Sequence, residues 1–192
     1  MSAGPYPTVL DFISNFLEKT SLPDPGMFTF AVIDKTRPPS AEDDEGQLAG
    51  MMSFASTSPV NLVTEIGYVM VLPAFHRTHV TTNAVGLMLK YALDGPYKGG
   101  LGLVRVHWQT STANVASLKT AERMGFRREA LLRWHMMFRD GVRKHKVGNG
   151  RALPPGSNEG DVGRDTVVLS LCWDDWEQGG RERVEKIMAR ID

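Results

Sequence analysis

The sequence has little of several features that mark particular protein classes. Its only cysteine, Cys172, can form no internal disulfide, and because it lies in an apolar run we expect it in the core. No apolar run approaches the roughly 20 residues of a membrane span, and the first residues lack the basic stretch and apolar core of a signal peptide. We therefore expect a cytoplasmic protein with no membrane partner, and a nuclear location stays open.

An excess of charge of either sign is also missing. Lys and Arg total 22, Asp and Glu total 22, and the formal net charge is zero. Such a balance does not favour nucleic acid as a partner. The chain of 192 residues shows no internal repeat and no linker, so we expect one domain over residues 1–192.

Hydrophobic periodicity predicts an alternation of helices and strands. We expect helices over residues 8–19, 80–94, 112–124 and 181–191, and strands over 27–34, 48–56, 64–72, 103–109, 130–139 and 166–174. A run of strands followed by strand-helix-strand-helix-strand favours an α/β (α+β) fold. Its sheet would be mixed and mostly antiparallel, with helices on both faces.

The most informative window is the strand-turn-helix junction over residues 65–83. An apolar strand ends at Pro73, a short polar turn follows, and a helix begins after His79. The first turn of a helix leaves four backbone N–H groups without partners, and the helix dipole adds positive charge there. Such a junction can bind a phosphate or pyrophosphate, and His76 and Arg77 add positive charge beside it. Many junctions of this kind bind nothing, so the pattern alone leaves both interpretations open.

Three sequence elements resemble the cofactor-binding motif of the GNAT superfamily of N-acetyltransferases. The likeness is to the branch with ribosomal-protein-alanine and spermidine acetyltransferases. The elements are Ile66-Gly67-Tyr68 with Pro73 and the turn 76–84, then a strand and Asn114-Val115-Ala116-Ser117, then Gly125-Phe126. The resemblance covers residues 27–173 and implies a GNAT fold. It also implies acetyl-CoA as cofactor and direct transfer of acetyl to a primary amine in a ternary complex.

The same resemblance assigns cofactor-binding residues by position. They are Met70, Val71, His76, Arg77, Thr78, His79, Val80, Thr81, Asn114 and Ser117. The strand that carries Val71 and the following strand would splay apart to admit the pantetheine arm, and the turn 76–81 would wrap the pyrophosphate. His79 stands where the family has glycine or a small residue. Either it makes a side-chain contact, or the pyrophosphate sits differently, or binding is weak.

Amine acetylation needs a base, an oxyanion donor and a proton for the leaving thiolate. Glu65 is the candidate base or amine anchor, acting directly or through water, and the Val71 N–H is the candidate oxyanion donor. Many members of the family that the sequence resembles have a general-acid tyrosine after the Gly-Phe element, but here no tyrosine follows Tyr97. Ser117 or water is therefore the candidate proton donor to the leaving sulfur. The alternative interpretations are a surface acid at a strand end for Glu65 and an ordinary helix-surface serine for Ser117.

The acceptor and the partners are less clear from the sequence. Trp134 and His135 precede the basic segment 139–146, and we expect them to line a pocket for a small-molecule amine or a protein N-terminus. The family's usual first strand has no counterpart, and the sheet edge this exposes leaves a homodimer possible.

The sequence also bears on a metal site and on a function without catalysis. His76 and His79 lack a third ligand nearby, so no metal is expected. A second functional interpretation is an acyl-CoA-binding or interaction protein that has lost the chemistry. His79 and the missing tyrosine motivate it.

Overall fold

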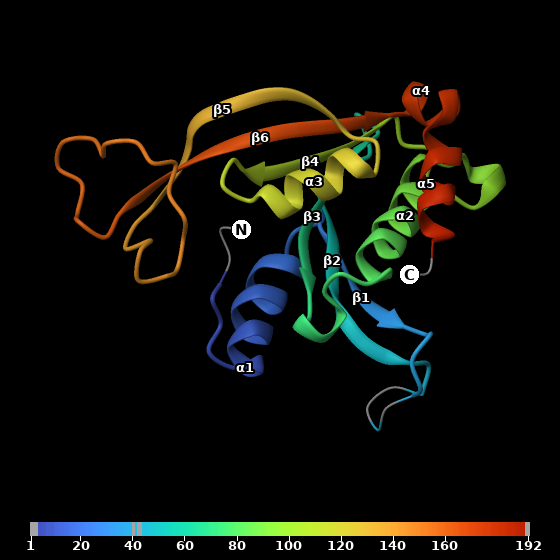
Figure 1. Ribbon diagram of the computed structural model, residues 1–192, viewed down its shortest axis with the longest axis horizontal. Coiled ribbons are helices and arrows are strands. Elements are labelled where there is room, and N and C mark those ends of the chain that lie inside the picture. The colour runs from blue at the N-terminus through green and yellow to red at the C-terminus, as the bar shows by residue number, and fades with distance from the viewer. Residues whose placement is uncertain (1–3, 40, 42–43, 191–192) are drawn as a thin grey trace.

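The computed structural model describes residues 4–39, 41 and 44–190 (Figure 1). The elements in chain order are α1 (Val9–Phe12), η1 (Ile13–Ser21), β1 (Phe28–Asp34), β2 (Gln47–Ser58), β3 (Val63–Val71), η2 (Pro73–Phe75), α2 (Val80–Leu93), η3 (Pro96–Lys98), β4 (Arg105–Ser111), α3 (Val115–Arg123), β5 (Arg127–Phe138), β6 (Val162–Cys172), α4 (Trp173–Asp175), η4 (Trp176–Gly180) and α5 (Arg181–Met188). Every helix and strand expected from the periodicity is present, with ends shifted by a few residues.

The two terminal helices differ from the expectation in detail. The first is α-helical for one turn and then continues through η1 with wide π-type turns. The last helix ends at Met188, and Ile191, which the prediction included, lies outside the described residues. No helix in the described ranges is long and apolar enough to cross a membrane.

Six strands form one sheet in the order β1-β2-β3-β4-β6-β5. Only the β3–β4 pair is parallel, and the other four pairs are antiparallel. This confirms the mixed, mostly antiparallel sheet. Among the described residues from Gly4 onward no strand precedes α1, so β1 forms one sheet edge and β5 the other.

The parallel seam between β3 and β4 is short. Only Val63–Glu65 pair with Arg105–His107, and the strands then diverge (Figure 1). The cause lies in β3, where Met70 pairs with Met51 but Gly67 pairs with Ser53, which leaves one extra residue in β3. Tyr68 in this bulge has a φ of 51°. A bulge bends its strand, so β3 turns away from β4 and the expected splay is formed.

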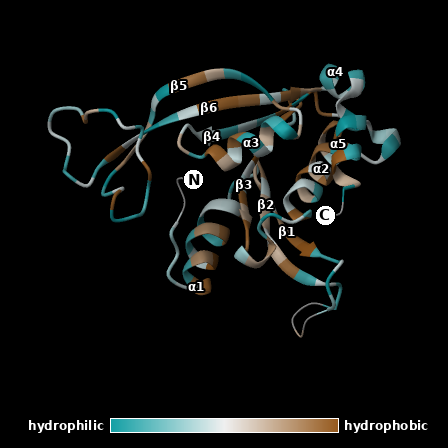
Figure 2. Cartoon of the chain, in the orientation of Figure 1, coloured by the Kyte–Doolittle hydropathy of each residue, from teal (hydrophilic) through white to brown (hydrophobic). Residues whose placement is uncertain are grey.

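The main core lies between one face of the sheet and helices α2, α3 and α5. Figure 2 shows apolar positions along α2, α3 and α5, and α5 packs against α2. Buried residues that build this core include Met52, Ile66, Val85, Leu89, Val106, Trp108, Leu118, Met124, Leu169, Leu171 and Val184. Each large apolar side chain buried here contributes roughly 1.5–3 kcal/mol. The two helices that flank the splay, α2 and α3, are thereby fixed against the sheet.

The opposite sheet face carries the first helix and a set of polar residues. Phe16 of η1 packs on Tyr68 with ring centroids 4.9 Å apart, so helices lie on both faces as expected. Cys172, which the sequence placed in the core, is only partly buried. The strand alternation turns its side chain toward Arg105, whose Nη1 lies 3.9 Å from the sulfur.

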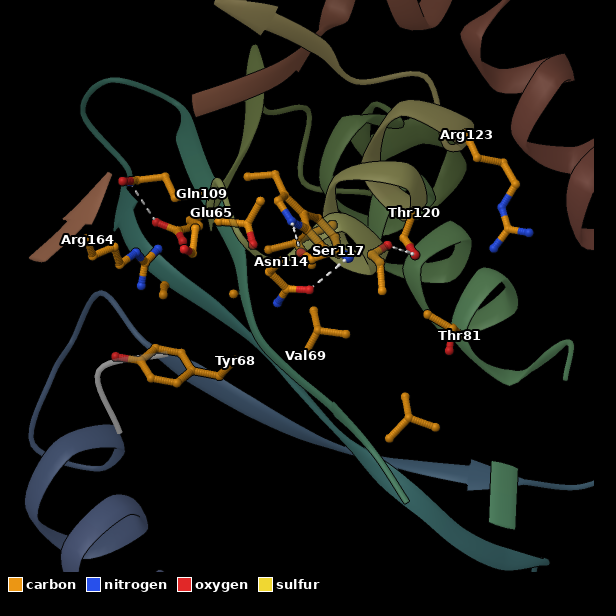
Figure 3. A pocket seen from close by; sticks show the side chains of 18 of the residues that line it. Glu65, Tyr68, Val69, Thr81, Gln109, Asn114, Ser117, Thr120, Arg123 and Arg164 are labelled. Atoms are coloured by element: carbon orange, nitrogen blue, oxygen red, sulfur yellow. Dashed lines mark hydrogen bonds between the residues drawn. The ribbon is translucent and has the colours of Figure 1, made fainter. Parts of the chain in front are cut away.

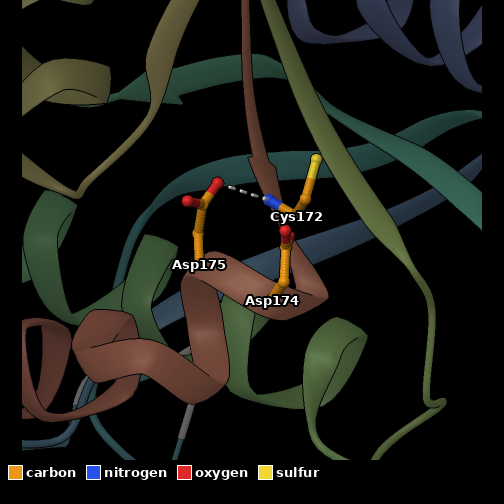
Figure 4. Close-up of side chains that lie close together, drawn as sticks. All are labelled: Cys172, Asp174 and Asp175. Carbon is orange, nitrogen blue, oxygen red and sulfur yellow. Dashed lines mark hydrogen bonds between the residues drawn. The ribbon is translucent and has the colours of Figure 1, made fainter.

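Cys172 also belongs to the one group of possible metal ligands in the described part of the chain. Its ligand atom and those of Asp174 and Asp175 lie within 4.8 Å of one another (Figure 4). The Cys172 backbone N–H donates to Asp175 Oδ2 at 3.4 Å, and Arg127 forms an ion pair with Asp175 at 2.7 Å. The group therefore acts as the N-terminal cap of α4.

Candidate functional site

A cleft of about 950 Å³ opens where the pairing of β3 and β4 stops. Figure 3 shows Glu65, Gln109 and Arg164 at one end and Thr81 and Arg123 at the other. The sequence-predicted residues that line it are Glu65, Val71, His76, Arg77, Thr78, Thr81, Asn114, Ser117 and His135. Residues from β3, the following turn, α2, α3 and β5 thus meet at one site.

Four other predicted residues do not line this cleft. Val80 is buried against Ala49 and Phe75, where it anchors the start of α2. The ring of Trp134 lies over Gly163, so closely that a Cβ on that glycine would come within 2.2 Å of it. Met70 and His79 also lie outside the lining. The structure therefore brings the Trp134 side chain to β6 and not to the cleft.

The end of β3 offers one backbone donor to the cleft. The Leu72 N–H donates to the Ala49 carbonyl at 2.8 Å, and in an antiparallel ladder such bonds alternate along the strand. The Val71 N–H is therefore directed away from β2, toward the opening. Its carbonyl accepts a hydrogen bond from His76 Nε2 at 2.9 Å. His76 thus occupies the carbonyl and leaves the N–H available.

The His79 side chain turns away from the cleft toward the end of β1. His79 Nε2 lies 3.4 Å from Asp34 Oδ1. Burial alone would raise the pKa of Asp34, but hydrogen bonds from Thr36 and the neighbouring His79 outweigh it and lower the pKa. The imidazole therefore does not line this cleft, but His79 does line a second cavity that adjoins the turn.

The first turn of α2 keeps free backbone donors. Helix α2 has no side-chain hydrogen bond at its N-cap. Within the described residues, the N–H groups of Thr81 and Thr82 donate to no backbone carbonyl. Thr81 lines the cleft, and free donors at the N-terminal end of a helix suit a phosphate group.

A second cavity of about 550 Å³ adjoins this turn and is strongly basic. Its cationic residues are Arg77, Arg123, Arg183, Lys186 and Arg190, and Arg77 and Arg123 also line the first cleft. None of the five forms an ion pair with a described acidic residue. Such a concentration of uncompensated positive charge favours a polyanionic ligand.

Sequence reasoning missed this basic cavity. Its residues come from a turn, the end of α3 and the last helix, which lie far apart in the chain. The available signal was the helical spacing of Arg183, Lys186 and Arg190, which places three cations on one helix face.

Ser117 and Asn114 lie together at the start of α3. Asn114 is the N-cap, and its Oδ1 accepts the Ser117 N–H at 3.1 Å. The Ser117 hydroxyl oxygen accepts from the buried Trp108 Nε1 at 2.9 Å. A hydroxyl that accepts one hydrogen bond still has its proton to donate. The Asn-x-x-Ser motif is therefore both a helix cap and a source of polar groups in the cleft.

Glu65 is held at the other end of the cleft by two neighbours from β4. Its Oε2 accepts from Gln109 Nε2 at 3.1 Å and lies 3.4 Å from His107 Nε2. The parallel pairing of Glu65 with His107 brings them together. The sequence did not single out His107, although strand alternation puts His107 and Gln109 on one face.

Arg164 of β6 completes this end of the cleft and was also missed. It is 8% exposed, and its Nε donates to Thr166 Oγ1 at 3.0 Å. The same hydroxyl lies 3.0 Å from His135 Nδ1. Burial lowers the pKa of Arg164, and the charge of Glu65 partly opposes this shift.

Comparisons with known proteins identify the family and the fold. The model of the family described as "Acetyltransferase (GNAT) domain" matches residues 3–127. A GCN5-related N-acetyltransferase from Brucella melitensis is 28% identical, with a TM-score of 0.71, over 98% of this chain and 69% of that one. A probable GNAT-family acetyltransferase from Chromobacterium violaceum is 26% identical, with a TM-score of 0.67, over 92% of this chain and 71% of that one.

A more distant structural likeness extends to spermidine N-acetyltransferase SpeG from Vibrio cholerae, in a mutant form. It is 14% identical, with a TM-score of 0.58, over 90% of this chain and 79% of that one, and at this identity it shows the fold alone. No curated protein matches the sequence. Because the family model covers well over half of the chain and the fold agrees, the chain belongs to the GNAT family of acetyltransferases.

Proposed function

We propose that the chain is an N-acetyltransferase that moves the acetyl group of acetyl-CoA to a primary amine by direct attack in a ternary complex. The observation that carries the proposal is the continuity of the site. The basic cavity and the cleft share Arg77, Thr78 and Arg123, and the cleft reaches from there to Glu65. Phosphate-binding groups thus lie at one end and a carboxylate at the other.

Acetyl-CoA fits the groups that line this path. The pantetheine arm would lie in the splay, where the Val71 N–H is available, and the pyrophosphate would lie at the first turn of α2. The five cations of the second cavity would hold the 3′-phosphate. Bound acetyl-CoA supplies the acetyl group as a reactive thioester.

Three groups of the chain would take part in the acetyl transfer. Glu65 would accept a proton from the incoming ammonium, so that the amine nitrogen can bond to the acetyl carbon. The Val71 N–H would donate to the thioester oxygen. The carbon–sulfur bond breaks, and Ser117 would donate its proton to the departing sulfur and take up the second proton that the bonded amine nitrogen loses. The products are the acetylated amine and the free thiol of CoA.

The alternative is an acyl-CoA-binding protein with weak or no activity. The missing tyrosine supports it, since no tyrosine follows Tyr97. The other support, the bulk of His79, is weaker because that side chain lies against Asp34. Ser117, held by Trp108 at the cleft, offers another proton donor. These two contacts favour the enzyme over the binding protein.

The test combines binding and turnover in the wild-type chain and in Glu65→Gln. We expect calorimetry to show acetyl-CoA binding in the micromolar range or tighter for both proteins. Loss of a positioned base costs about 10²–10⁴ in rate, so release of CoA thiol with a panel of primary amines should fall by that factor in the variant. Glu18→Gln, on the exposed surface of η1, is the matched control.

Three different results would contradict the catalytic activity, the role of Glu65 and the cofactor, respectively. Tight acetyl-CoA binding without turnover on any amine would favour the binding protein. Unaltered turnover in Glu65→Gln would remove Glu65 from the mechanism. Absence of acetyl-CoA binding would overturn the proposed function altogether.

A further inference from the structure

Arg164 is a buried cation that the acetyl-transfer steps above do not use. It lines the cleft beside Glu65 and is 8% exposed. No described carboxylate lies within 4.0 Å of its guanidinium nitrogens. Burial of a charge without a partner is costly. The chain therefore keeps a positive charge in its cleft that its own described residues do not neutralise.

The free side of this guanidinium faces the cleft. Nε is used by Thr166, and the Nη atoms have no hydrogen-bond partner among the described residues. No buried side-chain nitrogen or oxygen in the described ranges lacks a partner, so the two Nη atoms are accessible, and the space that Arg164 lines is the cleft. Thr166 is in turn held by His135, which fixes the orientation of the arginine. The result is a planar fork of donors presented to a ligand.

The position of Arg164 separates it from the cations that suit CoA phosphates. Those cations gather around the first turn of α2, whereas Arg164 lies on β6 next to Glu65 and Gln109 (Figure 3). Glu65 and Arg164 attract each other electrostatically without forming a direct ion pair. The acceptor end of the cleft thus contains one negative and one positive group, side by side.

We propose that Arg164 binds a carboxylate of the acceptor, so that the substrates are free amino acids or similar small zwitterions with an amine and a carboxylate close together. The proposal rests on the proposed function. The acceptor's ammonium would meet Glu65, and its carboxylate would receive two parallel hydrogen bonds from the guanidinium. A polyamine would instead place a second positive charge against Arg164. The site therefore selects against polycations.

The test compares L-amino acids with their carboxamides, which keep size and shape but lose the negative charge. CoA thiol release is followed in the wild-type chain, in Arg164→Gln and in Arg133→Gln, an exposed control on β5. A site built to bond one polar group rejects analogues that lack it, so we expect kcat/KM in the wild type to favour the accepted amino acid by about 100-fold. Arg164→Gln should abolish this preference, mainly through KM, and Arg133→Gln should retain it.

Calorimetry of acetyl-CoA binding separates the proposed role of Arg164 from the proposed acetyltransferase function. Arg164→Gln should bind acetyl-CoA as the wild type does, which also shows that the variant is folded. Equal rates for amino acids and carboxamides in the wild type would overturn the role of Arg164 and leave the acetyltransferase proposal standing. That comparison needs only the wild-type chain, so it decides the question even if the variant fails to fold. Faster turnover of spermidine than of any amino acid would also overturn the role of Arg164.

Discussion

Ser117 shows how one contact can give an ordinary residue type a role. Serines on helix surfaces are common, and the sequence alone left that interpretation open. In the structure the hydroxyl accepts from Trp108 Nε1, and Trp108 is 3% exposed. Because the indole donor fixes the oxygen, the hydroxyl proton is directed elsewhere, and the cleft is the open side.

We expect Ser117→Ala to affect rate and stability together. Loss of the proton donor should lower kcat by about 10–100-fold with little change in acetyl-CoA affinity. The Trp108 N–H would be left buried without a partner, which costs about 1–3 kcal/mol. Thiol-release kinetics and thermal unfolding measure the two effects, with Ser157→Ala in the loop between β5 and β6 as control. A stability loss with unchanged kcat would make Ser117 purely structural.

At the scale of elements, the strands could be predicted but their irregularities could not. Alternation located each strand because the core face is apolar along its length. The bulge at Tyr68 was hidden because an apolar run such as 64–72 looks the same with or without one extra residue. The splay was therefore known only through the family resemblance. Pairings between distant strands, such as the one that brings His107 to Glu65, depend on a register that alternation does not specify.

An ion pair on the sheet face opposite the main core joins three strands. Arg105 of β4 contacts Glu129 of β5 at 2.5 Å, and Ser170 of the intervening β6 donates to Glu129 at 2.7 Å. The Arg105 hydrogen bond is the main reason that the pKa of Glu129 falls from 4.5 to about 2. The cluster ties the edge strand β5 to the centre of the sheet.

This shifted pKa predicts how stability depends on pH. A carboxyl group whose pKa is lower in the folded state stabilises the fold above its unfolded pKa, and the gain is lost as pH falls toward the folded pKa. Glu129→Gln should therefore lower the free energy of unfolding at pH 7 by about 1 kcal/mol or less, since the side chain is 40% exposed. Urea titrations should show this difference shrinking between pH 4.5 and 2. A difference that persists at pH 2 would contradict the assignment.

The whole molecule brings together cations that the sequence keeps far apart. Arg77 precedes α2, Arg123 ends α3, and Arg183, Lys186 and Arg190 come from the end of the chain. Net charge of zero gave no sign of this cavity, because the same chain carries its acidic residues elsewhere. The motifs located the α2 turn, but the packing of α5 against α2 was needed to complete the site.

Charge reversal on α5 tests whether the cations of the second cavity bind acetyl-CoA. Arg183→Glu with Lys186→Glu should weaken acetyl-CoA binding by about 10–100-fold. The loss should be smaller in high salt, because salt screens exposed charges. It should also be smaller for acetyl-CoA that lacks the 3′-phosphate. The control is the double variant Lys19→Glu with Lys98→Glu, which lies on other surfaces and changes the net charge by the same amount. Its affinity for acetyl-CoA, measured by calorimetry, should be unchanged. Equal affinity in the two double variants would exclude the second cavity from binding.

The seam of only three paired positions between β3 and β4 also has a mechanical consequence. The sheet consists of two half-sheets, β1–β3 and β4–β6, that are joined only by this short parallel pairing. Beyond the seam, the facing backbone edges have no strand between them, so a ligand in the splay serves as cross-link as well as substrate. The two half-sheets should therefore move relative to each other when the cleft is empty, and they should move as one rigid body when a ligand fills it.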